Sequence, residues 1–191
     1  MKLGDEEDLM VFHKVILDSH HYLVVNDDDS NTADKYIPYV FISPACLESL
    51  NLPWPYMVRI KGPKRSLVTM LRDNHTMDQH IRVKEDFRKV MGIGRGEVVE
   101  LEPCPDVQSG EVELAVTDVT RFGSSGPIDF RGIISNFLEL CPGGLAFNQG
   151  FKFQVMVGLN GVFMVEFEVK KTSHGPACLV EKVEQVRVVE P

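Results

Sequence analysis

Short runs of apolar and β-branched residues, each bounded by turn-forming residues, recur along the chain and restrict it to a mainly β fold. Between positions 163 and 169, apolar residues alternate with Met164 and two glutamates, a spacing typical of a strand with one buried face. Many short strands at such intervals favour barrels or sandwiches over βαβ units. We predict strands at Tyr22–Val25, Tyr39–Ile42, Met57–Lys61, Leu67–Leu71, Val98–Leu101, Val112–Thr117, Phe153–Val157, Val162–Val169, Cys178–Val180 and Val186–Val189.

The helical signals are brief. Ser43 and Pro44 precede Ala45–Leu50 and combine an N-cap residue with a proline at the first helical position. Asp86–Met91 is followed by Gly92, a residue suited to ending a helix. We therefore predict two short helices, and the sequence shows no internal repeat.

The clearest place to divide the chain is the stretch 103–110, Pro-Cys-Pro-Asp-Val-Gln-Ser-Gly. Its prolines cannot donate to a central β-ladder, and its glycine permits a turn. We predict a partly disordered N-terminal segment at 1–19, a first β-rich lobe at 20–106 and a second at 107–191.

The net charge and the spacing of the cysteines indicate which kinds of partner and which cellular compartment to expect. The formal net charge of −8 repels a phosphate backbone, so we expect no nucleic-acid partner, whereas a basic peptide remains open. No apolar run approaches the roughly 20 residues that span a bilayer, so we expect no membrane insertion. The N-terminus lacks a secretory signal, and the four cysteines form no CxxC pair. This favours reduced thiols in the cytoplasm, with two long-range disulfides as the alternative.

No motif in the chain indicates catalysis. Gly92, Gly94 and Gly96 superficially resemble a phosphate loop, but a predicted strand follows them where a helix would be needed. The histidines give no HExxH spacing, and His75 and His80 lie in a polar stretch that we interpret as a solvated loop. There is no GxSxG elbow. We therefore predict no catalytic residue, no cofactor site and no metal site in this chain.

Trp54, the only tryptophan, stands between Pro53 and Pro55 ahead of a predicted strand. Two interpretations stay open. The side chain caps one end of a barrel, or it is a rigid amphipathic anchor for a partner protein, since tryptophan is favoured in binding hot spots.

A more specific signature lies at Glu100–Val107, Glu-Leu-Glu-Pro-Cys-Pro-Asp-Val, preceded by Ile81–Val83 and Gly96–Val98. This combination resembles the N-terminal domain of the valosin-containing protein family of AAA ATPases, and the resemblance runs from about Val15 onward. Further segments follow in the same order: Tyr22–Val25, Ile42–Leu52, Val58–Gly62 with Lys64 and Arg65, Phe137–Glu139, Val165–Val169 and Cys178–Val180.

The resemblance implies a double-psi β-barrel at 20–106, followed by a smaller, four-stranded type of β-barrel at 107–191. In that family the domain binds adaptors that carry ubiquitin-like domains or short linear motifs, and it meets ubiquitinated substrates indirectly. It sits on hexameric ATPase rings that extract ubiquitinated proteins. ATP and magnesium would belong to ring domains following Pro191. The present chain would be monomeric, in the cytoplasm or nucleus, and recruited to endoplasmic reticulum membranes through partners.

The resemblance also implies an apolar cleft with an acidic rim between the lobes. Its residues would be Tyr39 and Leu71 from the first lobe, Asp106 and Val107 from the joint, and Cys141 from the second lobe, with Trp54 as an anchor. Two alternatives are a free-standing ubiquitin-recognition cofactor of such an ATPase, which is similar in fold, and a double-psi-barrel enzyme with convergent carboxylates or a self-processing serine.

Overall fold

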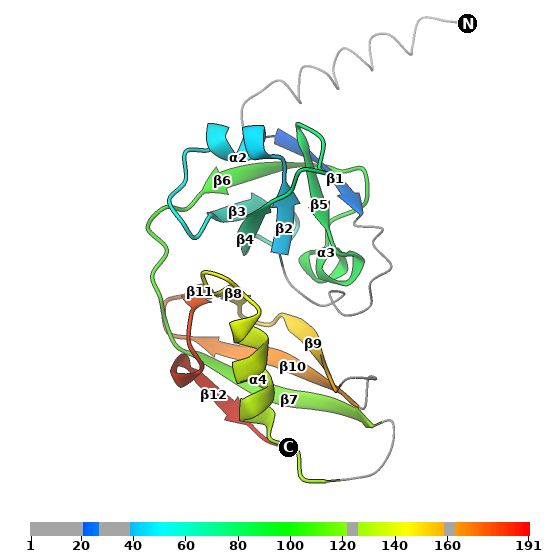
Figure 1. Cartoon of the computed structure of the whole chain (residues 1–191), viewed down its shortest axis with the longest axis vertical. Helices are drawn as coiled ribbons and strands as arrows, with labels where there is room; N and C mark the ends of the chain where they lie inside the picture. Colours follow the sequence, from blue (N-terminus) through cyan, green and yellow to red (C-terminus); the bar gives the residue numbers. More distant parts are fainter. Residues whose placement is uncertain (1–20, 27–38, 122–125, 159–162) are drawn as a thin grey trace, which may run out of the picture.

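The structure is a computed structural model that describes residues 21–26, 39–121, 126–158 and 163–191. Its elements are mainly strands, which confirms the predicted mainly β fold. Figure 1 shows two lobes stacked along the long axis, with β1 to β6 in one lobe and β7 to β12 in the other. The predicted N-terminal segment, 1–19, lies outside the described residues, as does Val162 of one predicted strand.

Six strands of the first lobe form a closed barrel in the order β1-β5-β2-β4-β3-β6, and the ring is completed by antiparallel pairing of β1 with β6. The first lobe also contains two short helices, α2 after β2 and α3 after β5. The elements are β1 (His21–Asn26), β2 (Tyr39–Ile42), α2 (Pro44–Ser49), β3 (Met57–Lys61), β4 (Ser66–Arg72), β5 (His80–Val83), α3 (Glu85–Met91) and β6 (Val98–Pro103).

The barrel contains a structural repeat that the sequence does not reveal. If β1 is exchanged with β4, β2 with β5 and β3 with β6, the set of paired strands and their directions stays the same. The antiparallel pairs β2–β5 and β3–β6 map onto themselves. The parallel pairs β1–β5 and β2–β4 exchange, as do the antiparallel pairs β1–β6 and β3–β4. The helices follow the same rule, because α2 comes after β2 and α3 after β5. The barrel is therefore built from two interleaved halves with the same order of elements.

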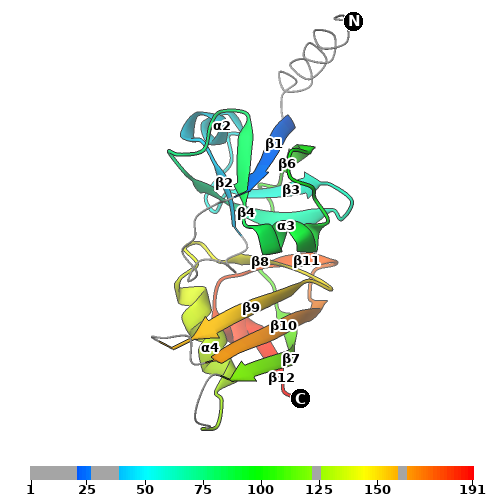
Figure 2. The same ribbon diagram turned by 90° about the vertical axis from the view of Figure 1, so that its right-hand side faces the viewer.

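Strand alternation gives the barrel one inner and one outer set of side chains. Val40 and Ile42 of β2, with Val68 and Met70 of β4, are fully buried in the barrel core. Phe41 of β2 and Leu71 of β4 lie at the alternate positions and pack against the core of the second lobe. Figure 2 shows that α3 also lies on the side of the barrel next to that lobe, and Phe87 of α3 meets Phe151 with 6.5 Å between ring centroids.

The second lobe is a four-stranded sheet in the order β12-β7-β10-β9, a separate ribbon of β8 and β11, and helix α4. Pairing among the described residues does not close this sheet into a ring, which differs from the smaller barrel that we predicted. The elements are β7 (Val112–Arg121), α4 (Phe130–Glu139), β8 (Leu145–Asn148), β9 (Lys152–Val157), β10 (Phe163–Thr172), β11 (Ala177–Val180), the 3-10 helix η2 (Val183–Gln185) and β12 (Val186–Val189).

Four of the described elements were not predicted. His80, which we interpreted as part of a solvated loop, begins β5. No strand or helix was predicted at β8 or α4, and none at the 3-10 helix η2. The sequence did carry a signal for α4, because Asp129, a good N-cap residue, precedes apolar residues at helical spacing. In the structure the Asp129 side chain accepts a hydrogen bond from the backbone N–H of Gly132. Its buried residues are Phe130, Ile133, Ile134, Phe137 and Leu138.

Candidate functional site

The junction between the lobes contains most of the residues that the sequence singled out. Tyr39, although it belongs to barrel strand β2, is 2% exposed and packs in the core of the second lobe, together with Cys141. Leu71 of β4 is half-buried against the same core. The structure therefore brings these three predicted cleft residues together, and it uses Tyr39 and Cys141 as buried contacts between the lobes.

Burial governs the chemistry of this pair. It raises the pKa of the Tyr39 hydroxyl, and the adjacent Cys141 thiol raises it further. Burial likewise raises the pKa of Cys141, whose thiol donates to the carbonyl oxygen of Phe137 over 3.2 Å. Both groups therefore stay neutral, and neither has the lowered pKa that an activated nucleophile needs.

Asp106 and Val107, the two predicted site residues on the joint, differ in burial. Asp106 is exposed on a turn after β6. Val107 is half-buried in an apolar cluster between the lobes, formed by Met57 and Leu67 of the barrel and by Ala146 and Leu179 of the second lobe. The joint is thus a packed contact, with the carboxylate of Asp106 at its surface.

Each lobe also contributes one large, exposed apolar side chain near the junction. Trp54 is 53% exposed and Leu140, at the C-terminal end of α4, is 69% exposed. Trp54 leans on Gly143, since a Cβ atom there would lie 2.7 Å from Cζ2 of the indole. Tyr56 supports the indole edge-on, with 5.2 Å between ring centroids. We call Trp54, Leu140 and the turn between Leu140 and Gly144 the junction edge.

Leu140 was not among the residues predicted for the site. Its exposure depends on its position at the end of α4, and that helix had not been predicted from the sequence. The sequence contained one indication of this exposure: Leu140 follows Glu139 and does not continue the helical spacing of the buried apolar residues of α4. Trp54, in contrast, was identified from the prolines beside it. The indole contacts Gly143 of the other lobe, and about half of its surface stays exposed, so it is available to a partner protein.

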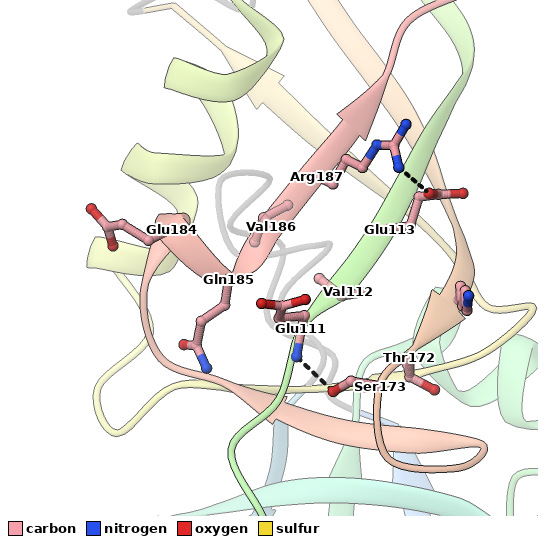
Figure 3. Close-up of a pocket in the computed structure, with 10 residues that line it drawn as sticks. Glu111, Val112, Glu113, Thr172, Ser173, Glu184, Gln185, Val186 and Arg187 are labelled. Carbon is pink, nitrogen blue, oxygen red and sulfur yellow. Dashed lines mark hydrogen bonds and ion pairs between the residues drawn. The ribbon is translucent and has the colours of Figure 1, made fainter.

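A hollow of about 480 Å³ lies elsewhere, on the second lobe, where β7, β10 and β12 meet (Figure 3). Its charges are mixed: Arg187 lies 3.5 Å from Glu113, and the backbone N–H of Glu111 donates to the Ser173 hydroxyl over 2.8 Å. The lining residues are Glu111, Val112, Glu113, Lys171, Thr172, Ser173, Glu184, Gln185, Val186 and Arg187.

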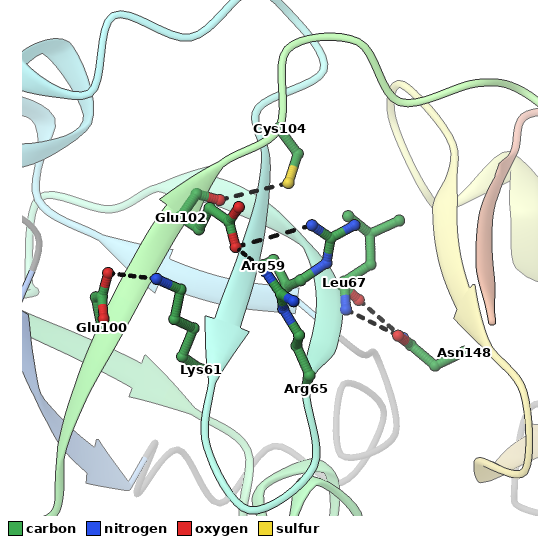
Figure 4. A network of polar contacts seen from close by, with 8 residues as sticks. All are labelled: Arg59, Lys61, Arg65, Leu67, Glu100, Glu102, Cys104 and Asn148. Carbon is green, nitrogen blue, oxygen red and sulfur yellow. Dashed lines mark hydrogen bonds and ion pairs between the residues drawn. The ribbon is translucent and has the colours of Figure 1, made fainter. Parts of the chain in front are cut away.

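The basic hairpin between β3 and β4 is largely neutralised by β6 (Figure 4). Arg65 binds Glu102 at 2.5 Å and Lys61 binds Glu100 at 2.6 Å. The hydrogen bond from Arg65 lowers the pKa of Glu102. Because these cations already have carboxylate partners, the hairpin is a poor binding surface for a phosphate backbone.

The remaining sequence expectations concern thiols, metals and membranes. All four cysteines are free, as expected for reduced thiols. Within the described ranges, no group of three or more His, Cys, Asp or Glu side chains could hold a metal ion. None of the described helices combines the length and apolar character needed to cross a bilayer. A comparison with models of known protein families found none that matches the chain.

Proposed function

We propose that this chain is a protein-binding module, the adaptor-binding N-terminal domain of an ATPase of the valosin-containing protein family. In this proposal the first lobe is a double-psi barrel. Its support is the strand order, in which two parallel pairs, β1–β5 and β2–β4, are related by the exchange of the two halves of the barrel. The segments that resemble the family occur in the family's order across both lobes.

The observation that carries the binding role is the junction edge. Trp54 and Leu140 come from different lobes, flank the same turn and leave large apolar surfaces open to solvent. A tryptophan that is held by its neighbours loses little side-chain freedom on binding, which is why such residues are frequent anchors in interfaces. A partner that covers both side chains would contact the two lobes at once.

The expected partner is a ubiquitin-like domain or a short linear motif that supplies apolar side chains and a basic residue. The net charge of −8 favours a partner of opposite charge. Asp106 offers an exposed carboxylate on the joint. An exposed rim charge contributes roughly 0–1 kcal/mol, so the apolar anchors dominate the affinity and the charges contribute mainly to orientation and association rate.

The test is calorimetric titration of the chain with a ubiquitin-like domain from an adaptor of that family. Trp54→Ala and Leu140→Ser should each weaken binding by about 2 kcal/mol, roughly a thirtyfold rise in Kd. The matched control is Met77→Ala, because Met77 is also an exposed apolar side chain but lies in the loop before β5.

Circular dichroism should show that all three variants keep the parent fold, since the substituted side chains are exposed. If Trp54→Ala and Leu140→Ser bind as tightly as the parent, or if Met77→Ala weakens binding equally, the junction edge is not the binding surface and the proposal fails.

A second candidate function is a free-standing ubiquitin-recognition cofactor of such an ATPase, because Leu50–Tyr56, the segment that contains Trp54, resembles that protein as well. The two functions differ in their ligand. The cofactor would bind ubiquitin itself, whereas the N-terminal domain would bind the adaptor's ubiquitin-like domain and require the cofactor to reach ubiquitin. The same calorimetric titration with ubiquitin separates them.

A further inference from the structure

One side chain forms a strand-like contact across the junction. Asn148, the last residue of β8, is 6% exposed. Its Oδ1 accepts a hydrogen bond from the backbone N–H of Leu67 over 2.8 Å, and its Nδ2 donates to the carbonyl oxygen of Leu67 over 2.8 Å. Figure 4 shows both bonds converging on this one residue of β4. The carboxamide thus pairs with Leu67 as the backbone of a neighbouring strand would.

The barrel register explains why Leu67 needs this partner. Met70 of β4 donates its N–H to Tyr56, on the β3 side, so residues 67, 69 and 71 direct their backbone groups to the opposite side, where β2 lies. Strand β2 begins with Tyr39, which pairs with Thr69. Leu67 therefore precedes the start of β2, and its N–H and carbonyl have no strand to pair with among the described residues.

The surroundings make these two bonds costly to lose. Leu67 is buried in the cluster with Met57, Ala146 and Leu179, between the barrel and the ribbon of β8 and β11. Water has little access there, and a buried backbone group without a partner is strongly unfavourable. Removing the carboxamide would leave both groups of Leu67 unpaired inside an apolar contact.

We propose that Asn148 is a positioning residue, which fixes the second lobe against the barrel and thereby holds Trp54 and Leu140 in one arrangement. The ribbon that carries Asn148 is connected to the turn at Gly143 and Gly144, the turn on which Trp54 rests. A shift of β8 relative to β4 therefore changes the distance between the two halves of the junction edge. The fixed arrangement lowers the entropic cost of binding a partner that covers both halves; this last step rests on the proposed function.

The positioning role is measurable without any partner. Amide hydrogen exchange should show Leu67 strongly protected in the parent chain and about 10- to 100-fold faster in Asn148→Ala, because the amide has lost its acceptor. The Met70 amide, bonded within the barrel, should keep its protection. Trp54 emission should shift to longer wavelength as its contact with Gly143 loosens. Asn136→Ala, an exposed asparagine on α4, is the matched control and should change none of these.

Asn148→Asp gives a second, chemically specific test. At neutral pH its carboxylate still offers an acceptor to the Leu67 N–H, but its second oxygen faces the Leu67 carbonyl oxygen and repels it, so Leu67 should exchange faster than in the parent chain. At acidic pH the protonated acid regains a donor and should restore protection after correction for the intrinsic pH dependence of exchange, which Asn148→Ala cannot do. Rescue in the aspartate variant alone supports the paired hydrogen bonds. Equal protection of Leu67 in all variants overturns the inference.

The effect on binding is measured by calorimetric titration with the same ubiquitin-like domain of an adaptor. Asn148→Ala should bind it about tenfold more weakly, although no residue of the junction edge has changed. Loss of Leu67 protection with unchanged affinity would overturn the positioning role, while Trp54→Ala would still report on the proposed function. If the parent itself does not bind the domain, the proposed function fails, and the exchange data still decide whether Asn148 holds the lobes together.

Discussion

At the scale of single residues, Tyr39 has different surroundings at the two ends of its side chain. Its ring packs in the core of the second lobe, yet its buried hydroxyl oxygen has no hydrogen-bond partner among the described residues. The adjacent Cys141 thiol gives its hydrogen to Phe137, and a sulfur atom is a weak acceptor. The ring therefore stabilises the junction, and the hydroxyl contributes little.

Tyr39→Phe should consequently leave the free energy of unfolding unchanged or raise it by up to about 1 kcal/mol, because it removes a buried polar group without a good partner. Tyr39→Ala should lower it by about 3–5 kcal/mol through the cavity that it leaves. Urea unfolding followed by circular dichroism measures both. A loss above about 2 kcal/mol in Tyr39→Phe would mean that the hydroxyl has a strong partner after all.

At the scale of elements, Glu166 ties together three strands on the outer face of the second-lobe sheet. Its carboxylate accepts hydrogen bonds from Thr117 of β7 at 2.7 Å, from Lys152 of β9 at 3.1 Å and from Gln154 of β9 at 3.3 Å. The bond from Thr117, followed by those from Lys152 and Gln154, lowers the pKa of Glu166 despite partial burial. The charged form is therefore favoured by folding.

Because the pKa of Glu166 is lower in the folded chain, its stabilising contribution is complete above the ordinary carboxyl pKa. It is lost as the pH falls through the lowered value. Lys152→Met should raise the carboxyl pKa of Glu166, as followed by NMR titration, and should reduce the loss of stability between neutral and acidic pH. Lys170→Met is the control, since Lys170 pairs with Glu168 instead. An unchanged Glu166 titration in Lys152→Met would contradict the assignment.

At the scale of the whole molecule, the lobes share buried surface and should unfold together. Tyr39 of the barrel belongs to the core of the second lobe, and the cluster around Leu67 and Leu179 draws on both lobes. Trp54, the only tryptophan, rests on the second lobe and reports on the junction. In urea, its fluorescence and the far-ultraviolet circular dichroism should therefore give one coincident transition. Separate midpoints would show that the lobes are independent units.

Local chemistry was enough to predict ten of the twelve described strands and two of the helices. Alternating side chains define one buried face without reference to the rest of the chain. The N-cap of α2 is also local: Ser43 accepts a hydrogen bond from the N–H of Cys46 at 3.3 Å, three residues away. Gly92 ends α3 with a φ of 72°, a conformation that glycine adopts without strain. Trp54 could be identified for the same reason, from the prolines beside it.

The tertiary structure alone decided which strands pair and what reaches the junction. The two halves of the barrel share an order of elements but no repeated sequence, because many apolar residues can fill the same inward positions. Tyr39 enters the core of the other lobe, and Asn148 pairs with Leu67 across 81 residues. Neither contact has a local signal. Each depends on where a strand begins and on which buried backbone groups are then left without a partner, and that is settled only when the chain closes on itself.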